Sequence, residues 1–175
     1  MQSGNGELQL DKSELLNLLK IFDEEASKQI CLVAVGGTAM TLLNLKLSTK
    51  DIDFTVPGAD KPEFDRVRKT IPHGYTIDVW ADGTIFCVTL PSDYLQRSSD
   101  VVSFEKIHLK ALHPVDIVVT KAARLENHDV ADIKECIKKF GVRREDVQKR
   151  AQEIVYVGKE EDYWYNVRWV LDNLF

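Results

Sequence analysis

Residues 32–54 read LVAVGGTAMTLLNLKLSTKDIDF, and this stretch decides the expected fold. The apolar run Ile30–Val35 is short, partly β-branched and stopped by glycines, which is typical of a core strand that ends in a tight turn. Thr38–Lys46 follows with apolar residues at amphipathic spacing and predicts a helix. Gly36 and Gly37 then form the turn that joins the strand to the helix.

Two glycines at the start of a helix place unpaired backbone N–H groups beside an open turn. Such a helix end attracts phosphate, so Gly36 and Gly37 are candidate phosphate-binding residues. A Gly-Gly pair after a strand is equally often a plain turn. Thr38 and Thr49 could also hydrogen-bond phosphate, although threonine at the start of a helix or strand ordinarily makes a local capping bond.

Two aspartates, Asp51 and Asp53, stand one residue apart at the end of the stretch. Residues two apart on a strand share a face, so both carboxylates point one way while Ile52 and Phe54 point into the core. Mg²⁺ prefers hard oxygen ligands and is usually held by one or two carboxylates together with substrate phosphates. The pair therefore suits Mg²⁺ with a nucleotide, although the same alternation also occurs on strands that only face solvent.

The ordered combination of these features resembles a known family. Gly36-Gly37, thirteen intervening residues and Asp51-Ile52-Asp53 resemble the signature of the polymerase-β-like nucleotidyltransferase superfamily. The resemblance is closest to its small stand-alone members, the abortive-infection (AbiEii-type) toxin-like nucleotidyltransferases, in which a Ser/Thr-x-Asp-x-Asp strand follows the glycines. A second block at residues 112–133 resembles the Lys-…-Arg-…-Asp-x-x-Asp segment of the same relatives. The two blocks cover roughly residues 30–135.

The resemblance implies a Mg²⁺-dependent enzyme, in which Mn²⁺ may replace Mg²⁺. It would transfer a nucleoside monophosphate from a nucleoside triphosphate to a hydroxyl of a protein, a tRNA or a small molecule, by in-line displacement with two metal ions. The implied catalytic and metal-binding residues are Asp51, Asp53 and Asp78, and the implied nucleotide-binding residues are Gly36, Gly37, Thr38, Thr49, Lys121 and Asp129.

Asp78 is the expected third acid because it lies inside the predicted strand Tyr75–Trp80. In the family resembled, that strand lies beside the strand of Asp51, so the three carboxylates would converge. Three converging carboxylates repel one another unless a metal neutralises them. The alternative is an exposed residue near a sheet edge, and Asp82 or Glu105 could compete for the role.

Lys121 precedes Asp129 by eight residues and Asp132 by eleven, so the three could return to one helical face. The resemblance implies that Lys121 contacts the triphosphate and that Asp129 holds it in place. The alternative for Asp129 is a helix N-cap, and for Asp132 we favour a solvated helix face. Lys50 is expected to face away from the acids by strand alternation.

The chain of 175 residues, with 44% hydrophobic and 29% charged residues, has the composition of a globular protein. We expect an α+β fold with a mixed α/β core: a disordered N-terminus at 1–9, a nucleotidyltransferase-like core at 10–112 and a helical C-terminal region at 113–175. Predicted helices are Leu10–Lys28 (capped by Asp11 or Ser13), Lys61–Thr70, Pro114–Glu126, His128–Phe140, Arg143–Val155 and Glu161–Leu174. Predicted later strands are Tyr75–Trp80, Thr84–Leu90, Val101–Phe104 and Ile107–Leu112.

Several observations bear on partners and location. A net charge of −5 gives no strong signal for duplex nucleic acid. Neither a signal-peptide pattern nor a run of ~20 apolar residues is present, so we expect a cytoplasmic protein without a membrane partner. The aromatic residues around Tyr163 and Trp164 could stack a base, but their helical spacing favours packing in the core or in the groove of a homodimer or a cognate partner.

Two other functions compete with the transferase. One is a non-catalytic nucleotide-binding or toxin–antitoxin interaction module of the same fold, although no part of the motif is visibly degraded. The other is a phosphodiesterase or nuclease metal site, which would leave the Gly-Gly turn unexplained. The four histidines show no metal-ligand spacing, and the phosphate-loop signature is absent.

Overall fold

The structure is a computed structural model that describes residues 8–175. The expectation of disorder at 1–9 therefore falls mostly on residues that lie outside the described ones. Within the described part, eight helices and ten strands form a mixed α/β arrangement whose C-terminal region is helical, which confirms the predicted fold class. No helix in this part is long and apolar enough to span a membrane.

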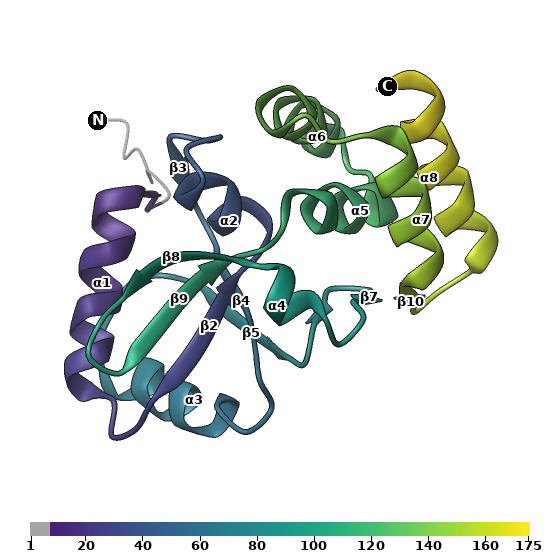
Figure 1. Ribbon diagram of the computed structural model, residues 1–175. Coiled ribbons are helices and arrows are strands. Elements are labelled where there is room, and N and C mark those ends of the chain that lie inside the picture. The colour runs from purple at the N-terminus through teal and green to yellow at the C-terminus, as the bar shows by residue number, and fades with distance from the viewer. Residues whose placement is uncertain (1–7) are drawn as a thin grey trace, which may run out of the picture.

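A mixed five-stranded sheet forms the centre of the molecule (Figure 1). Its strand order is β5-β4-β2-β9-β8. Pairs β2–β9 and β4–β5 are parallel, whereas β2–β4 and β8–β9 are antiparallel. The strands are β2 (Ile30–Ala34), β4 (Ile52–Val56), β5 (Ile77–Ala81), β8 (Ser99–Ser103) and β9 (Ile107–Ala111).

Helices α1 (Lys12–Glu25) and α3 (Lys61–Thr70) pack together against the sheet through aromatic rings. The Phe22 ring meets the Phe64 ring edge-on at 6.0 Å, and Phe64 meets Phe54 of β4 at 5.6 Å. Asp11 caps α1 as expected, because its carboxylate accepts from the Glu14 N–H at 2.8 Å while the Glu14 carboxylate accepts from the Asp11 N–H.

Helix α2 (Gly36–Leu42) differs from the predicted Thr38–Lys46 at both ends. Gly36 takes a φ of +53° and starts the helix directly after β2, so the glycines form its first turn as well as the bend before it. The helix stops early because Asn44 adopts a left-handed φ of +59°. The chain then forms β3 (Ser48–Thr49), which pairs with β1 (Leu10–Asp11).

The predicted single strand Thr84–Leu90 is wrong. The segment is a tight hairpin of β6 (Thr84–Ile85) and β7 (Val88–Thr89), and Phe86 in its turn has a φ of +51°. The reversal was not expected because Phe86-Cys87 is not a turn dipeptide. Strand β10 (Val155–Tyr156) of the C-terminal region adds to β7 and so ties that region to the core.

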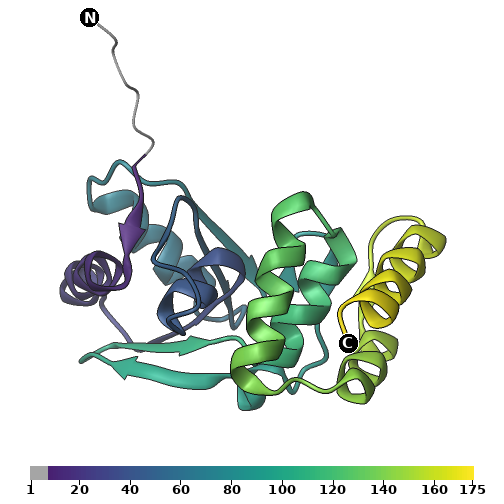
Figure 2. The ribbon, with the colours of Figure 1, turned by 90° about the horizontal axis from the view of Figure 1, so that it is seen from above.

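The C-terminal helices gather at one end of the molecule, opposite α1 (Figures 1 and 2). They are α5 (Pro114–Arg124), α6 (Asn127–Phe140), α7 (Arg144–Glu153) and α8 (Glu160–Asn173), while the short α4 (Tyr94–Arg97) was not predicted. In α8, Tyr163 is buried and its hydroxyl donates to the Ala151 carbonyl at 2.6 Å, which agrees with packing, whereas Tyr165 is exposed. The predicted homodimer or cognate partner stays a prediction.

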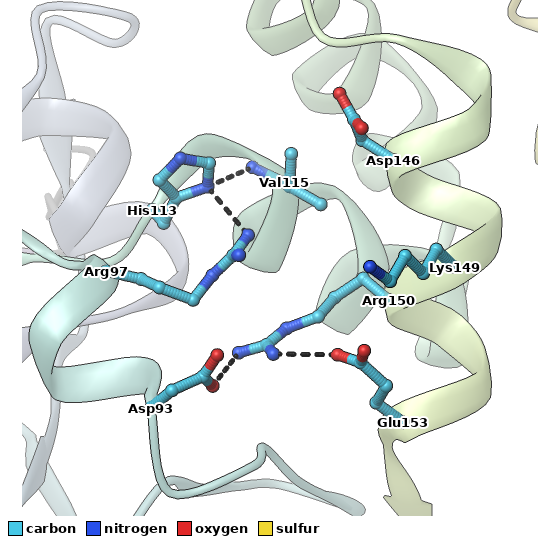
Figure 3. A pocket seen from close by; sticks show the side chains of 8 residues that line it. All are labelled: Asp93, Arg97, His113, Val115, Asp146, Lys149, Arg150 and Glu153. Atoms are coloured by element: carbon cyan, nitrogen blue, oxygen red, sulfur yellow. Dashed lines mark hydrogen bonds and ion pairs between the residues drawn. The ribbon is translucent and has the colours of Figure 1, made fainter.

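Arg150 of α7 connects this helix to Asp93 at the start of α4 (Figure 3) and to α5. The guanidinium is almost fully buried and donates to both carboxylate oxygens of Asp116 on α5, at 2.6 and 3.1 Å. It also pairs with Asp93 at 2.9 Å and with Glu153 at 2.9 Å. Arg150, Asp93 and Glu153 line a small pocket of about 370 Å³ that contains both acidic and basic side chains. The Arg150 charge in this pocket forms the ion pairs that join α7 to α5 and to the start of α4.

Candidate active site

The three predicted acids lie at one pocket. In the parallel register of β4 and β5, Asp53 and Asp78 are direct partners, and Asp51 immediately precedes β4. All three line a pocket of about 620 Å³, while Ile52 and Phe54 are fully buried on the other side of the strand. The sequence reasoning predicted this convergence, although Asp51 stands just outside the strand to which it was assigned.

Asp53 occupies an unusual environment for a carboxylate. Its side chain is buried, and Oδ1 has no hydrogen-bond partner among the described residues. Burial raises the pKa of Asp53 to about 7, and the nearby charges of Asp78 and Asp51 add to this shift. A buried, unpartnered carboxylate oxygen between two further acids is a position that a bound cation would stabilise.

The donor set around that position fits a hard divalent metal. Asp51 and Asp78 are exposed to the pocket, so three carboxylates can offer oxygen ligands from one side. Within the described residues, Glu126, His128 and Asp129 are the one group of three potential ligands whose ligand atoms all lie within 4.8 Å of one another, so the carboxylates of Asp51, Asp53 and Asp78 stand further apart than this. In the former group the Asp129 oxygens already accept hydrogen bonds from Lys121 and Arg124, so a cation would have to compete with them.

Gly36 and Gly37 border the acids closely. A Cβ atom at Gly36 would lie 3.3 Å from Asp53 Oδ2, and one at Gly37 would lie 3.0 Å from Thr49 Oγ1. Both glycines line the pocket. The absence of side chains therefore keeps the backbone of α2 accessible beside the carboxylates.

The two threonines hold the backbone of the acidic segment. Thr38 Oγ1 donates to the Asp51 carbonyl at 3.2 Å and accepts from the Asp53 N–H at 2.9 Å, and Thr49 Oγ1 donates to the same carbonyl at 2.8 Å. Thr38 is fully buried, whereas Thr49 lines the pocket. These bonds support the local capping alternative for Thr38 in particular, because its hydroxyl hydrogen is already donated.

Lys121, Asp129 and Asp132 meet across the turn between α5 and α6. Lys121 Nζ lies 3.1 Å from Asp129 Oδ1 and 2.8 Å from Asp132 Oδ2, and Lys46 reaches the same Asp132 oxygen at 2.9 Å. Asp132, expected on a solvated face, is therefore buried in an ion-pair network. Asp129 is the third residue of α6 and forms a capping box with Glu126, which is the actual N-cap.

Arg124 is a pocket residue to which the sequence motif assigned no role. It donates to both Asp129 oxygens, at 3.0 and 2.8 Å. Burial alone would raise the pKa of Asp129, but the bonds from Arg124 and the charge of Lys121 outweigh it, so the pKa lies below its ordinary value. Both partners of the pair are thus charged near neutral pH.

Lys50 also lines the pocket, which corrects the expectation that it faces away from the acids. Lys50 precedes β4 and lies in the connection from β3, so the alternation of a strand does not apply to it. The pocket therefore contains four basic side chains beside its acids, and these are Lys46, Lys50, Lys121 and Arg124. Only Lys121 among them was predicted, since the other three depend on how loops and helix ends pack.

Comparison with known proteins bears on this geometry. A family model described as "Nucleotidyltransferase of unknown function (DUF6036)" matches residues 13–171. Searches of curated proteins and of solved structures found no match. The matched range contains every acid, glycine and basic residue of the pocket described above. The chain therefore belongs to DUF6036, a family of nucleotidyltransferases of unknown function.

Proposed function

We propose that the pocket transfers a nucleoside monophosphate from a nucleoside triphosphate to a hydroxyl group, with Mg²⁺ as the cofactor. The observation that carries this proposal is the buried Asp53 carboxylate, one oxygen of which has no hydrogen-bond partner among residues 8–175 and which lies in register with Asp78. A carboxylate in that setting is costly to the fold unless it binds a cation. Membership of a nucleotidyltransferase family supports the same chemistry.

The residues present suit Mg²⁺, or Mn²⁺ in its place, because the converging ligands are carboxylate oxygens. Asp51, Asp53 and Asp78 would hold the metal. When bound, it would neutralise charge on the phosphate oxygens and on the acids themselves. The motif resembles that of AbiEii-type toxins, and the proposed acceptor is a hydroxyl of a protein, a tRNA or a small molecule.

The basic side chains are proposed to bind the triphosphate. Lys46 and Lys50 lie in the connections before β4, Lys121 and Arg124 lie on α5, and all four line the pocket together with the acids. Lys121 and Arg124 are held by Asp129, so they are positioned before substrate arrives. Gly36 and Gly37 would let phosphate approach the backbone of α2 closely. Thr49 borders this position, whereas Thr38 acts through the backbone of Asp51 and Asp53.

In the reaction the acceptor oxygen forms a bond to the α-phosphorus while the bond from that phosphorus to the bridging oxygen of the leaving pyrophosphate breaks. An acid–base group of the site must accept the proton of the acceptor hydroxyl. Asp78 is proposed to receive it, since it is the exposed acid on the edge strand β5. Arg124 and the lysines then stabilise the charge on the departing pyrophosphate.

A crystal of the protein grown with Mg²⁺ and a nonhydrolysable nucleoside triphosphate tests this proposal. We expect the triphosphate to lie between the three acids and the four basic residues, with metal density at Asp53. Binding measured by calorimetry should require Mg²⁺ and should be lost in Asp53→Asn. A nucleotide found elsewhere on the molecule, with no metal at Asp53, would contradict the proposal.

A further inference from the structure

Phe86 stands out among the side chains that line the active-site pocket. Every other lining residue in the described part of the chain is charged, polar or glycine, so Phe86 contributes the single apolar side chain. Its ring is 46% exposed although other large apolar groups of the core nearby, such as Ile85, are buried. A single exposed apolar side chain is ordinary on a protein surface, but this ring stands among the charged groups of the pocket, where the flat face of a ligand could cover it.

The backbone at Phe86 is also unusual. Its φ of +51° lies in the left-handed region, which residues other than glycine, asparagine and aspartate rarely adopt. Backbone strain of this kind tends to persist at sites where it positions a functional group. Here it occurs in the turn between β6 and β7, directly beside the pocket.

Two neighbours fix the orientation of the ring. The Trp80 ring of β5 packs against Phe86 with centroids 4.7 Å apart and planes 53° apart, and the Arg124 guanidinium carbon lies over the ring, 4.9 Å from its centroid, so a ligand reaches the part of the ring that these two neighbours leave exposed. Arg124 is itself held by both oxygens of Asp129. The ring is therefore held from the sheet and from the helical region, which is how a preorganised contact surface is built.

We propose that the base of the donor nucleoside triphosphate stacks on Phe86, an inference that rests on the proposed function. A nucleoside triphosphate carries charge at one end and a single flat, weakly polar group at the other. The pocket offers the matching set, since basic side chains and carboxylates occupy most of it and one exposed ring occupies the remainder. Every base has an aromatic face, so such a platform binds a base without needing to select it.

The test separates the base from the phosphates. Calorimetry with Mg²⁺ compares a nonhydrolysable nucleoside triphosphate with inorganic tripolyphosphate, which lacks both base and ribose. The variants are Phe86→Leu, which removes the ring face, Phe86→Tyr, which keeps it, and Phe86→Asn, which removes the ring with a residue that accepts left-handed backbone. Tyr165→Leu is the matched control, because Tyr165 is an exposed aromatic residue on α8 outside the pocket.

We expect the Leu and Asn variants to weaken nucleoside triphosphate binding by about 5- to 150-fold. Tripolyphosphate binding should not change, and both Phe86→Tyr and Tyr165→Leu should keep the wild-type affinity for both ligands. Equal nucleotide affinity in the wild type and in the Phe86→Leu and Phe86→Asn variants would overturn the stacking of the base on Phe86 but not the proposed function. A parallel loss of tripolyphosphate binding in these variants would have the same meaning. If the wild type binds neither ligand with Mg²⁺, the proposed function itself fails.

Discussion

Asp53 is the residue whose surroundings depart furthest from those of an ordinary carboxylate. It is buried beside two other acids, and its backbone N–H and the carbonyl of Asp51 are both bonded to Thr38. The side chain therefore cannot move away from the like charges without disturbing β4. The folded protein therefore keeps the Asp53 carboxylate in an electrostatically unfavourable environment, at the position where a bound cation would be most stabilising.

This charge predicts an unusual dependence of stability on pH. Without metal, the pKa of Asp53 is about 7 in the folded protein against an ordinary 3.8. Well below pH 3.8 the carboxyl is protonated in both the folded and the unfolded chain, so it has no effect on the free energy of unfolding there. As the pH rises to 7, Asp53 ionises more readily in the unfolded chain than in the folded one. The free energy of unfolding therefore falls by up to about 4 kcal/mol.

Asp53→Asn should therefore be more stable than wild type in chelator at pH 8, and the difference should shrink as the pH falls towards 4. Thermal unfolding across that pH range measures this. Addition of Mg²⁺ should raise the melting temperature of the wild type and not of the variant. Wild type and variant curves that run parallel over the whole range would contradict the environment assigned to Asp53.

Motif spacing brought Asp51, Asp53 and the two glycines together at one pocket, because these residues are close in the sequence, whereas the place of Asp78 followed from the resemblance, which sets its strand beside β4. Lys50 was misjudged since the rule of alternation holds only inside a strand, and Lys50 precedes one. Phe86 carried no usable signal, and Arg124 was part of the motif at residues 112–133 without a role assigned to it. A phenylalanine in an apolar run is expected to lie in the core. The left-handed backbone of Phe86, where the chain turns, is seen only in the folded structure.

Among the elements, the periodic ones were predictable and the short ones were not. Both ends of helix α3 were predicted correctly, because Pro62 marks its start and its charged residues follow a helical pattern throughout. The hairpin β6–β7, strand β10 and helix α4 were missed. Each has four or fewer residues per segment, and such segments form through pairing and packing with distant parts of the chain.

The contact between helices α5 and α7 depends on one buried cation. Arg150→Met leaves the fully buried carboxylate of Asp116 with only Arg97, whose Nε is 3.6 Å away. Removal of one partner from a buried pair typically costs 3–5 kcal/mol, so we expect a loss of about that size in the free energy of unfolding measured with urea.

Arg143→Met is the matched control, because the Arg143–Asp146 pair stands at the exposed start of α7 and should contribute little. The double variant Asp116→Leu/Arg150→Met should recover much of the stability, since no charge remains unpaired. If Arg150→Met unfolds at the wild-type urea concentration, Arg150 does not hold the helices together.

For the whole molecule, the pocket joins two parts of the chain that are far apart in the sequence. The sheet and its hairpin supply the acids and Phe86, whereas α5 supplies Lys121 and Arg124. Strand β10 and the ion pair of Lys46 with Asp132 connect the two parts. The predicted division at residue 112 therefore separates elements of one site, which the helical region completes.

The measurement that tests the central claim most directly is the transfer of label from each α-³²P nucleoside triphosphate, with Mg²⁺, to the protein itself, to total tRNA and to cell lysate. Wild type is compared with Asp53→Asn and with the surface control Tyr165→Leu. If the pocket transfers nucleotide, label appears on one class of acceptor with wild type and with Tyr165→Leu, and no label appears with Asp53→Asn. Equal labelling by Asp53→Asn, or no label from the wild type on any acceptor, would contradict the proposed transfer, and the latter result would favour a non-catalytic nucleotide-binding module.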